Sequence, residues 1–531
     1  MEQDRHYDFI VIGSGFGGAV AAHRLTEKGY RVAVIEKGRR YHTTDFPKTN
    51  WNLRKSFWMP KLGLHGIQAL TLLRHVLILH GTGVGGGSLV YANQLLMPPD
   101  DVLEKPEWGH EDWSERIKPF YQKAQQMLGV VRCPGIGNSD KVLREVGLEV
   151  RGEDSFHIND VGVFFGEPGE TVKDPYFNGK GPDRTGCTLC GACMVGCPVG
   201  AKNTLDKNYL YLAEQAGAQI FPETEVVAVR PAVSGYEIQI QNTRGLFRRS
   251  QVFHADQVVF SGGVLGTVRL LLKCKQSGWL PDISDQLGRF VRTNSEAILA
   301  VETRDRETNW NDHIAITSGI YPDEETHIEM VRFNEGSDVM LALGTLLTDD
   351  GGRIPRWLRF LGNILRNPFQ FLRFLWVPGQ STRNALLLAM QTIDNYIHLE
   401  RRVRWWKLGS AALDSTLPPE TERIPAYIPV ANEVARRMAV KMDGFPRSSW
   451  FEVTMNAPTT AHILGGCAMA GSPETGVIGL DGRIFGYSGL YVVDGSVVPV
   501  NLNVNPALTI TALAEYILSQ MPEKAKGYNP A

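Results

Sequence analysis

The feature that most constrains the fold is a run of glycines near the start of the chain. A continuous apolar stretch over 9–12 leads into the spacing G-x-G-x-x-G at 13–18, and the residues that follow predict a helix over 19–28. A second apolar stretch over 31–35 ends at Glu36. Strand, helix, strand and acid form a βαβ unit of about 30 residues, which is the pattern of a dinucleotide-binding sheet.

Each part of this unit has a physical role in holding such a ligand. The glycines allow a tight turn and a close approach to a pyrophosphate, whose charge lies at the helix N-terminus. Glu36 is expected to bind the ribose hydroxyls, and its charge disfavours a 2′-phosphate. The alternative is an ordinary glycine-rich loop, but the register of all four parts favours dinucleotide binding. The predicted contacts are Gly13, Gly15, Phe16, Gly17, Gly18 and Glu36.

A second glycine-rich stretch lies at 81–93, with five glycines in its first seven residues. Such a run gives up too much chain entropy to form a packed helix, and it is suited to backbone that lies directly on a flat ligand. A flexible loop is the alternative, although the apolar flanks argue against a solvated linker. The predicted ligand contacts here are Gly83, Gly85, Gly86, Gly87, Ser88 and Asn93.

Bulk composition restricts the class of protein. The chain has 531 residues, 43% of them hydrophobic, and 55 glycines, which suits an α/β enzyme with more than one domain. A net charge of −2 gives no field that would attract nucleic acid. No run of 18 uncharged apolar residues occurs, and the first strand begins within about seven residues of the start. We therefore expect neither a membrane-spanning helix nor a secretory signal.

The seven cysteines include a cluster with the spacing C-x₂-C-x₂-C-x₃-C-P, and the odd total favours a reducing, cytoplasmic compartment. This spacing is that of the ferredoxin run which ligates iron–sulfur clusters, so a cluster is one hypothesis. Such a run usually needs a distant further thiolate. Free buried thiols, a local disulfide, or small residues packed under a cofactor loop are the alternatives. The run is Cys187, Cys190, Cys193 and Cys197, and the distant candidates are Cys133, Cys274 and Cys467.

The middle of the chain predicts an extension of the dinucleotide-binding sheet. Helices are expected over 113–128 and 201–216, and residues 51–80 are apolar and irregular. After residue 218 the pattern changes to short alternating strands that end in glycines and a further helix. The strands are predicted over 223–230, 236–240, 251–254 and 257–261 and the helix over 265–273. Val226 and Val227, in the first strand, are predicted cofactor contacts.

Residues 298–398 are strand-rich and predict a separate sheet that shapes a substrate cavity. Within this region the segment 353–377 carries five arginines, no acid, and apolar residues at helical spacing. A basic, aromatic, amphipathic helix is typical of peripheral membrane contact. A core helix whose arginines extend to solvent is the alternative.

The C-terminal region carries the densest motifs. His462 lies in the segment 459–469, and a buried strand over 490–493 ends at Asp494. Asn505 and Pro506 lie where a helix is expected to begin, since proline is tolerated at a first helical position. That helix would direct its free amides at an electron-rich ligand edge, such as that of a reduced flavin.

Taken in order, these motifs resemble those of glucose–methanol–choline (GMC) flavoproteins, and most of all their bacterial cholesterol-oxidase branch. The resemblance covers nearly the whole chain. It implies an α/β fold in which an FAD-binding Rossmann-type domain is interrupted by an α+β substrate domain built on a β-sheet. It also implies FAD, alcohol oxidation, and a catalytic pair at His462 and Asn505. The segments that carry the resemblance are 13–18 with Glu36, 81–93, 201–210, 462–466 and 504–506.

On this basis residues 1–50, 78–98, 200–290 and 460–525 are assigned to the FAD-binding domain, and residues 99–199 and 291–459 to the substrate domain. Two departures from the family pattern matter. Val268 stands where the family usually has proline, and no acid occurs over 379–384, where cholesterol oxidases carry an isomerising glutamate. Isomerisation, and cholesterol itself as substrate, are therefore doubtful. No histidine follows the glycines of 81–93, so we expect FAD to be held non-covalently.

The expected reaction is oxidation of a secondary or long-chain alcohol in an apolar cavity. His462 would accept the hydroxyl proton and Asn505 would hold the oxygen, while hydride leaves for the flavin. Residues 85–88 would lie against the flavin ring, with Asp494, Gly495 and Pro506 beside it. Oxygen or another electron acceptor would reoxidise the flavin. One alternative is a dehydrogenase that passes electrons to a quinone or redox protein at a membrane, with or without an iron–sulfur cluster. The other is a lyase or decarboxylase of this fold.

Overall fold

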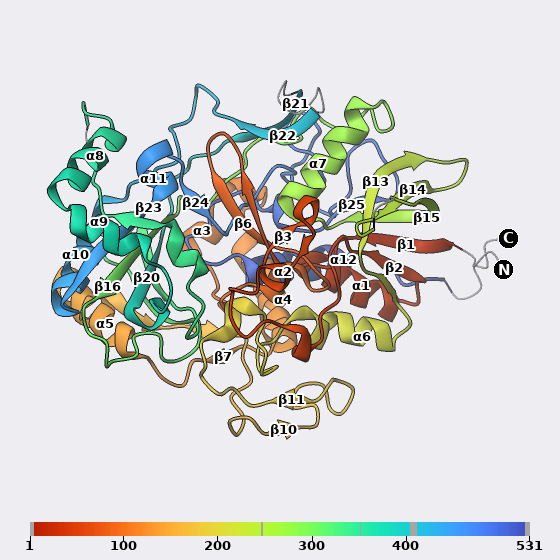
Figure 1. Cartoon of the computed structure of the whole chain (residues 1–531). Helices are drawn as coiled ribbons and strands as arrows, with labels where there is room; N and C mark the ends of the chain where they lie inside the picture. The colour runs from red at the N-terminus through yellow and green to blue at the C-terminus, as the bar shows by residue number, and fades with distance from the viewer. Residues whose placement is uncertain (1–4, 246–247, 351, 404–410, 526–531) are drawn as a thin grey trace.

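Two large β-sheets organise the protein. The computed structural model describes residues 5–245, 248–350, 352–403 and 411–525. One sheet lies at the end of the molecule that carries both termini, and the other lies at the opposite end, beside the helices drawn in green and blue (Figure 1). No helix within these ranges combines the length and the apolar character needed to cross a bilayer.

The first sheet contains the predicted βαβ unit. Strand β1 (His6–Ile12) pairs in parallel with β2 (Val32–Ile35), and helix α1 (Phe16–Glu27) connects the two. Strand β12 (Gln219–Phe221) pairs in parallel with the outer side of β2. Six of the seven residues of β1 are buried, because a central parallel strand is covered on both faces. The predicted Rossmann-type arrangement is confirmed.

Strand β15 (Ser250–Phe260) joins the parallel and antiparallel parts of this sheet. Its first half pairs with β14 (Tyr236–Asn242), which pairs with β13 (Thr224–Pro231). Its second half pairs in parallel with β25 (Leu490–Val492), while β1 pairs along its other edge. The two strands predicted over 251–254 and 257–261 are therefore one, because the ladder with β1 continues across the expected break.

Helices α1, α4 (Trp113–Leu128), α6 (Tyr209–Gln215) and α12 (Ala507–Ser519) pack together beside the first sheet. The prediction for 113–128 is confirmed, but the helix predicted over 201–216 covers only the last part of that range. Side chains of the preceding residues bind backbone carbonyls elsewhere and so hold this stretch extended. Lys202 donates to the carbonyl of Cys193, and Asn203 donates to the carbonyl of Leu128.

The second sheet is antiparallel, with the order β19-β23-β16-β20-β18-β17-β8. One face packs against α5 (Asn138–Val150) and α10 (Pro429–Lys441) in an apolar core. The strands are β8 (Phe156–Ile158), β16 (Ala297–Thr303), β17 (Ile316–Ile320), β18 (Thr326–Val331), β19 (Gly344–Leu346), β20 (Asn384–Gln391) and β23 (Gly444–Ser449).

The region between the two sheets was predicted from the sequence to be irregular. Residues 51–80 instead contain α2 (Leu53–Ser56), β3 (Trp58–Met59), β4 (Leu64–His65), β5 (Gln68–Leu72) and the start of β6 (Leu77–Gly81). The β5–β6 hairpin projects from the middle of the molecule (Figure 1). Strand β24 (Thr459–Thr460) pairs in parallel with β6 and so positions the segment that carries His462.

The remaining helices include α7 (Gly263–Gln276), which extends the helix predicted over 265–273 at both ends. The segment 353–377 forms two helices, α8 (Arg356–Arg366) and α9 (Pro368–Leu375). They are separate because Pro368 cannot continue α8 but fits the first position of a new helix. Helix α11 (Trp450–Met455) packs against α8.

One carboxylate joins the four packed helices. Glu515 of α12 is 1% exposed and receives paired bonds from Arg24 of α1, at 2.8 and 2.7 Å. Tyr209 of α6 donates to it at 2.7 Å, and the ammonium of Lys123 of α4 lies 3.1 Å away. These bonds lower the pKa of Glu515 although burial opposes ionisation.

We expect Glu515→Ala to lower the free energy of unfolding by about 3 kcal/mol, because Arg24, Tyr209 and Lys123 would lose the buried carboxylate that they share. Denaturant unfolding of the purified protein measures this. Glu115→Ala is the control, since Glu115 pairs with Lys118 at the surface and should cost less than about 1 kcal/mol. Equal losses in the two variants would contradict the assignment.

Candidate functional site

A cavity of about 1080 Å³ lies between the two sheets and contains most of the predicted site. One end is lined by both glycine-rich loops and Glu36, and the other by apolar residues of β16, β18 and β20. His462 and Asn505 lie in the lining as well. The cavity therefore joins a polar, glycine-lined trough to an apolar chamber.

The glycine-lined trough depends on close backbone contacts. A Cβ on Gly86 would lie 2.6 Å from the Cα of Gly15, so the two glycine loops touch. A Cβ on Gly17 would overlap the carbonyl oxygen of Val493. A Cβ on Gly15, by contrast, would meet nothing within 4 Å. No side chain caps the start of α1, so its first amides remain available to an anion in the trough.

Glu36 connects the two glycine loops. Its carboxylate accepts bonds from the amide of Ser14 at 3.1 Å, the hydroxyl of Ser14 at 2.8 Å and the amide of Gly38 at 2.8 Å. The amide of Gly83 in the second loop lies 3.4 Å from it. Glu36 lines the trough, so the predicted role toward a ribose stays open to test, but this carboxylate also fixes the loops relative to each other.

His462 is held by a buried acid that the sequence did not predict. Its Nδ1 lies 2.5 Å from Oε1 of Glu296, whose other oxygen accepts the amide of Ala461 at 2.8 Å. Burial disfavours the imidazolium, but the charge of Glu296 and the bond to it, with a further contribution from Glu329, raise the pKa of His462. Glu296 thus fixes the ring and stabilises a proton that arrives on it.

Asn505 connects His462 to a second buried acid. Its Nδ2 lies 3.1 Å from Oε2 of Glu329 and 3.3 Å from Nε2 of His462. Asn159 of the segment after β8 donates to the other oxygen of Glu329 at 3.1 Å. Burial raises the pKa of Glu329 to about 7, against the bonds from Asn505 and Asn159 and the charge of His462. Among the described residues, Oδ1 of Asn505 is buried and has no hydrogen-bond partner.

This arrangement can accept a proton from a bound hydroxyl. With Nδ1 bonded to Glu296, Nε2 is the ring nitrogen left to accept, and it points toward Asn505 in the cavity wall. The amide and the imidazole nitrogen together offer one donor and one acceptor to an oxygen, which is the pattern that general base catalysis on an alcohol needs.

The structure divides the predicted ligand contacts into two groups. Gly18, Gly83, Gly85, Ser88 and Asn93 lie outside the cavity lining; Ser88, for example, bonds the carbonyl of Gly85 and the amide of Leu205. The predicted residues that line the cavity are Gly13, Gly15, Phe16, Gly17, Glu36, Gly86, Gly87, Val226, Val227, His462, Asp494, Gly495, Asn505 and Pro506.

Asp494 is bound within the fold as well as lining the cavity. Its oxygens accept from the hydroxyl of Thr267 at 2.5 Å and from the amide and hydroxyl of Ser496 at 2.8 and 2.6 Å. Burial raises the pKa of Asp494 in spite of these bonds. The carboxyl therefore anchors the turn that leads from β25 to Asn505.

Glu296 and Glu329 were missed from the sequence because neither belongs to a recognised motif. Glu329 interrupts the strand sequence of β18, and Glu296 directly precedes β16. An acid within a buried strand is a usable signal, since an unpaired carboxylate is costly there. Glu329 also weakens the argument against isomerisation that the lack of an acid over 379–384 provided. Strand β18 pairs with β20 so that Glu329 lies opposite Leu388, and this pairing brings a carboxyl to the site. The doubt about isomerisation stays untested.

The four-cysteine run does not fit an iron–sulfur cluster. Within the described ranges no three His, Cys, Asp or Glu side chains are placed to share a metal ion. Cys187, Cys193 and Cys197 are buried, whereas Cys190 is exposed. The run instead packs beneath the second glycine loop, because Lys202 bonds the carbonyls of Leu89, Tyr91 and Cys193 at 2.9, 3.2 and 2.6 Å. This favours the alternative in which small residues support a cofactor loop.

Comparisons with known proteins agree with the motifs. Residues 180–284 and 415–514 match GMC oxidoreductase, and residues 11–51 match an NAD(P)-binding Rossmann-like domain. A cholesterol oxidase of Mycobacterium tuberculosis is 45% identical, covering 98% of this chain and 92% of the relative. One of Acinetobacter baumannii is 43% identical, covering 98% and 95%.

More distant proteins share the architecture. A long-chain-alcohol oxidase of Arabidopsis thaliana is 25% identical over 97% of this chain and 67% of its own length. Among solved structures, pyridoxine 4-oxidase from Mesorbium loti superposes with a TM-score of 0.64 at 14% identity, covering 97% of this chain and 98% of that one. At that identity the likeness concerns the fold alone.

Glu329 should make stability depend on pH. An unfolded glutamate has a pKa near 4.5, and the folded value is about 7, so between these values the folded state binds the extra proton and stability falls as pH rises. Glu329→Gln removes that penalty. We expect the variant to match wild type at pH 5 and to exceed it at pH 8 by as much as about 3 kcal/mol.

Denaturant unfolding across this pH range measures the difference. Glu115→Gln serves as control because the Glu115 side chain is 78% exposed, so it should leave the pH profile unchanged. A constant offset between Glu329→Gln and wild type at all pH values would contradict the raised pKa.

Proposed function

This chain belongs to the GMC oxidoreductase family, in its cholesterol-oxidase branch, and from that premise we propose that it oxidises the hydroxyl of an apolar alcohol to a carbonyl. It is an FAD-dependent oxidoreductase that acts on alcohols. Two kinds of relative suggest the substrate class: those named for cholesterol and those named for long-chain alcohols. Both kinds of substrate place a hydroxyl on a large apolar body.

The residues present fit FAD. The uncapped start of α1 and the open space over Gly15 suit a pyrophosphate, and Glu36 lies within reach of an adjoining ribose. The loop at Gly86 and Gly87 lines the cavity next to Gly15. Because these glycines have no side chains, the loop backbone itself would contact the ligand. The start of α12, at Pro506, also lacks a side-chain cap and faces the cavity. When bound, FAD would supply the hydride acceptor for the reaction.

His462 is the proposed base. Its Nε2 faces the cavity, and Nδ1 is committed to Glu296, so a proton taken from the alcohol at Nε2 gives an imidazolium beside a buried carboxylate. Low polarity around the pair strengthens this stabilisation. The raised pKa of His462 also means that the ring must lose a proton before it can act, so the reaction should accelerate as pH rises.

Asn505 is the proposed oxygen-positioning residue. Its amide nitrogen already lies 3.3 Å from Nε2 of His462 and is oriented by Glu329, so an alcohol oxygen placed between amide and imidazole would meet both. That places the carbinol carbon toward the trough and the rest of the substrate toward the second sheet. Holding the oxygen at two points restricts the rotation of the substrate before reaction.

The substrate chamber is predominantly apolar. Side chains from four strands of the second sheet line it, and Met340 and Leu341, in the short helix Val339–Leu343, close one wall. An extended or polycyclic hydrocarbon body would bury its surface here, at about 25 cal/mol for each Å². The strand residues are Ile298, Ala300, Ile316, Val331, Leu386 and Leu388.

Domain assignment follows the same proposal. Residues 1–50, 78–98, 200–290 and 460–525 would bind FAD, and 99–199 with 291–459 would enclose the substrate. The observation that carries the proposal is the placement of the His462–Glu296 pair at the junction of trough and chamber. Two other activities use the same residues: transfer of electrons to a quinone or redox protein, and a non-oxidative reaction. Peroxide formed in air separates the first from oxidase activity, and turnover without flavin reduction identifies the second.

We expect His462→Ala to leave FAD bound with its visible absorbance intact and to slow flavin reduction by a long-chain alcohol at least about a hundredfold. Anaerobic stopped-flow reduction measures the rate. His254→Ala, in which an exposed histidine of β15 is removed, should reduce at the wild-type rate. Normal reduction in His462→Ala would remove the assignment of the base.

Glu296→Gln tests the positioning role of the acid. Without the carboxylate the pKa of His462 should fall, so the acidic limb of kcat/KM moves to lower pH while the plateau drops at least about tenfold. The control is Glu452→Gln, because Glu452 is also fully buried, with a pKa raised by burial to about 8, but bonds Ile298 instead of His462. An unmoved limb in Glu296→Gln would show that the pair does not set the protonation of His462.

A further inference from the structure

Helices α8 and α9 carry apolar side chains on two sides, and other parts of the described chain cover only one of these sides. Phe360 and Phe374 point inward and pack with Leu346 and Val453 in a small core. The outer side carries large apolar side chains that nothing in the described chain covers; Leu365 and Phe369 are 83% and 85% exposed. The exposed apolar residues of this segment are Ile354, Trp357, Leu358, Leu361, Leu365, Phe369, Leu372, Leu375 and Trp376.

The charge of this segment has a single sign. Residues 353–377 contain five arginines and no acid. Arg356 is buried, where it bonds the carbonyls of Thr348 and Ala426, and Arg373 bonds Glu302. The other three, Arg353, Arg359 and Arg366, are exposed and lie among the apolar side chains.

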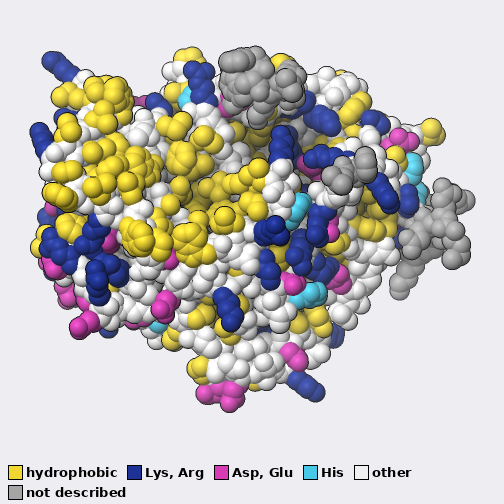
Figure 2. Space-filling model, viewed as in Figure 1, with side chains coloured by type: hydrophobic (Ala, Val, Ile, Leu, Met, Phe, Trp, Pro, Cys, Tyr) yellow, Lys and Arg dark blue, Asp and Glu magenta, His cyan; other side chains and the backbone are white. Residues whose placement is uncertain are grey.

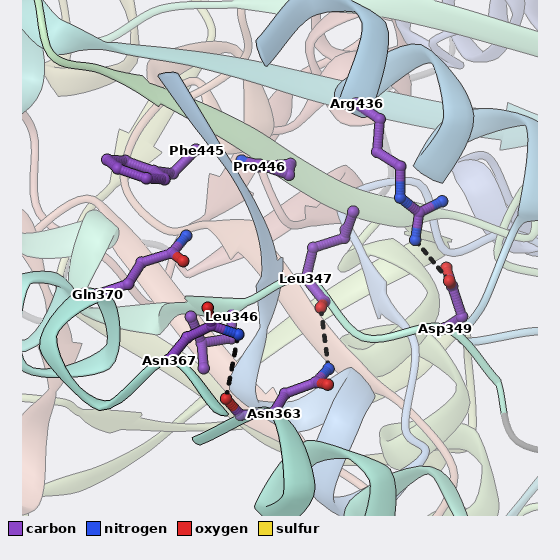
Figure 3. Close-up of a pocket in the computed structure, with 9 residues that line it drawn as sticks. All are labelled: Leu346, Leu347, Asp349, Asn363, Asn367, Gln370, Arg436, Phe445 and Pro446. Atoms are coloured by element: carbon purple, nitrogen blue, oxygen red, sulfur yellow. Dashed lines mark hydrogen bonds and ion pairs between the residues drawn. The ribbon is translucent and has the colours of Figure 1, made fainter. Parts of the chain in front are cut away.

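The uncharged polar side chains of the pair lie on its other side. Asn363, Asn367 and Gln370 line a cavity of about 350 Å³ between the helices and the second sheet (Figure 3). Arg436 and Asp349, which form an ion pair 2.5 Å long, close its far wall. The outer face of α8 and α9 therefore combines apolar groups with arginines and few other polar groups.

A second segment has the same character. Residues 46–99 contain no acid, and five of them are lysine or arginine. Two basic residues, Arg54 and Lys61, are exposed among apolar side chains that are exposed too. These apolar residues are Trp51, Leu53, Met59, Leu62 and Leu72.

Asp338 ties the two segments together. One of its oxygens accepts the indole N–H of Trp51 at 3.2 Å and the amide of Gly379 at 3.0 Å, and the other accepts the amide of Ser381 at 2.7 Å. Figure 2 shows apolar side chains gathered over α8 and α9 and continuing toward the middle of this face, with Lys and Arg around them. We call these two segments, 51–72 and 354–376, the basic apolar face.

Residues of the basic apolar face, and residues next to it, also line the large cavity that contains the substrate chamber. Lys61, Thr71 and Leu73 of the first segment and its hairpin line the large cavity. Met340 and Leu341 line it as well, two and three residues after Asp338 in the chain. A molecule that leaves a lipid layer beneath this face would therefore meet the wall of the chamber.

We propose that the basic apolar face docks on an anionic lipid surface and that the alcohol enters the chamber from that surface; the second part rests on the proposed function. Exposed Trp, Phe and Leu side chains enter the interface between headgroups and acyl chains, and arginines bind lipid phosphates. A second copy of this chain fits the face poorly, because the two segments that form it contain no acid that could pair with the arginines of another copy.

The test uses the FAD-loaded enzyme and vesicles of phosphatidylcholine with or without about 30% phosphatidylglycerol. We expect sedimentation with the anionic vesicles and about twenty-fivefold weaker binding for Arg353→Gln/Arg366→Gln, at about fivefold for each charge. Leu365→Ser/Phe369→Ser should weaken binding at least about tenfold. Val440→Ser on α10 is the matched control, because Val440 is 83% exposed but lies outside the face, and it should bind like wild type.

Measurements of activity distinguish failure of the docking proposal from failure of the proposed function. Leu365→Ser/Phe369→Ser should oxidise a long-chain alcohol in detergent micelles at the wild-type rate and the same alcohol in anionic vesicles at least about tenfold more slowly. A wild-type enzyme that binds vesicles but oxidises no alcohol in micelles would overturn the proposed function alone. Absence of vesicle binding, equal loss in Val440→Ser, or a dimer that Leu365→Ser/Phe369→Ser dissociates would overturn the docking proposal.

Discussion

Backbone contact between distant segments is the constraint on which the site depends. Gly15 touches Gly86, and Gly17 touches Val493, so three parts of the chain meet without side chains between them. A side chain at Gly86 or at Gly17 would overlap the facing backbone, so it would separate these segments and widen the trough. Because the contacts are between main chains, the geometry of the trough does not depend on side-chain rotamers, and the carboxylate of Glu36 bridges the first two segments with directed bonds.

The residues proposed to carry the chemistry lie where the two sheets face each other. The first sheet and the strands beside it supply the loop of His462 and the start of α12. Glu329 lies in strand β18 of the second sheet, and Glu296 directly precedes strand β16 of the same sheet. Neither half contains a complete site. The bonds across the junction therefore perform two tasks, since they orient the reacting groups and hold the sheets at a fixed separation.

Those parts of the fold and the site that depend on local sequence patterns could be predicted from the sequence. The βαβ unit, α4, the strand before Asp494 and the helix after Pro506 follow from periodicity, glycine spacing and proline position. The partners of His462 could not be predicted, because Glu296 lies 166 residues away and only strand register brings it there. The first part of the helix predicted over 201–216 was wrong for a related reason: Lys202 and Asn203 make distant bonds that override helix propensity, and helix α6 begins only at Tyr209.

The buried groups at the junction are coupled in a direction that suits the proposed reaction. Glu329 contributes to the raised pKa of His462, and a charge on His462 lowers the pKa of Glu329. A proton that arrives on the imidazole therefore favours the loss of a proton from the carboxyl on the far side of Asn505. Since the folded pKa of Glu329 is about 7, the carboxyl can respond near neutral pH, whereas a glutamate in water would already be ionised. Under the proposed mechanism, burial of Glu329 would thus limit the positive charge that accumulates when the imidazole takes the proton of the alcohol.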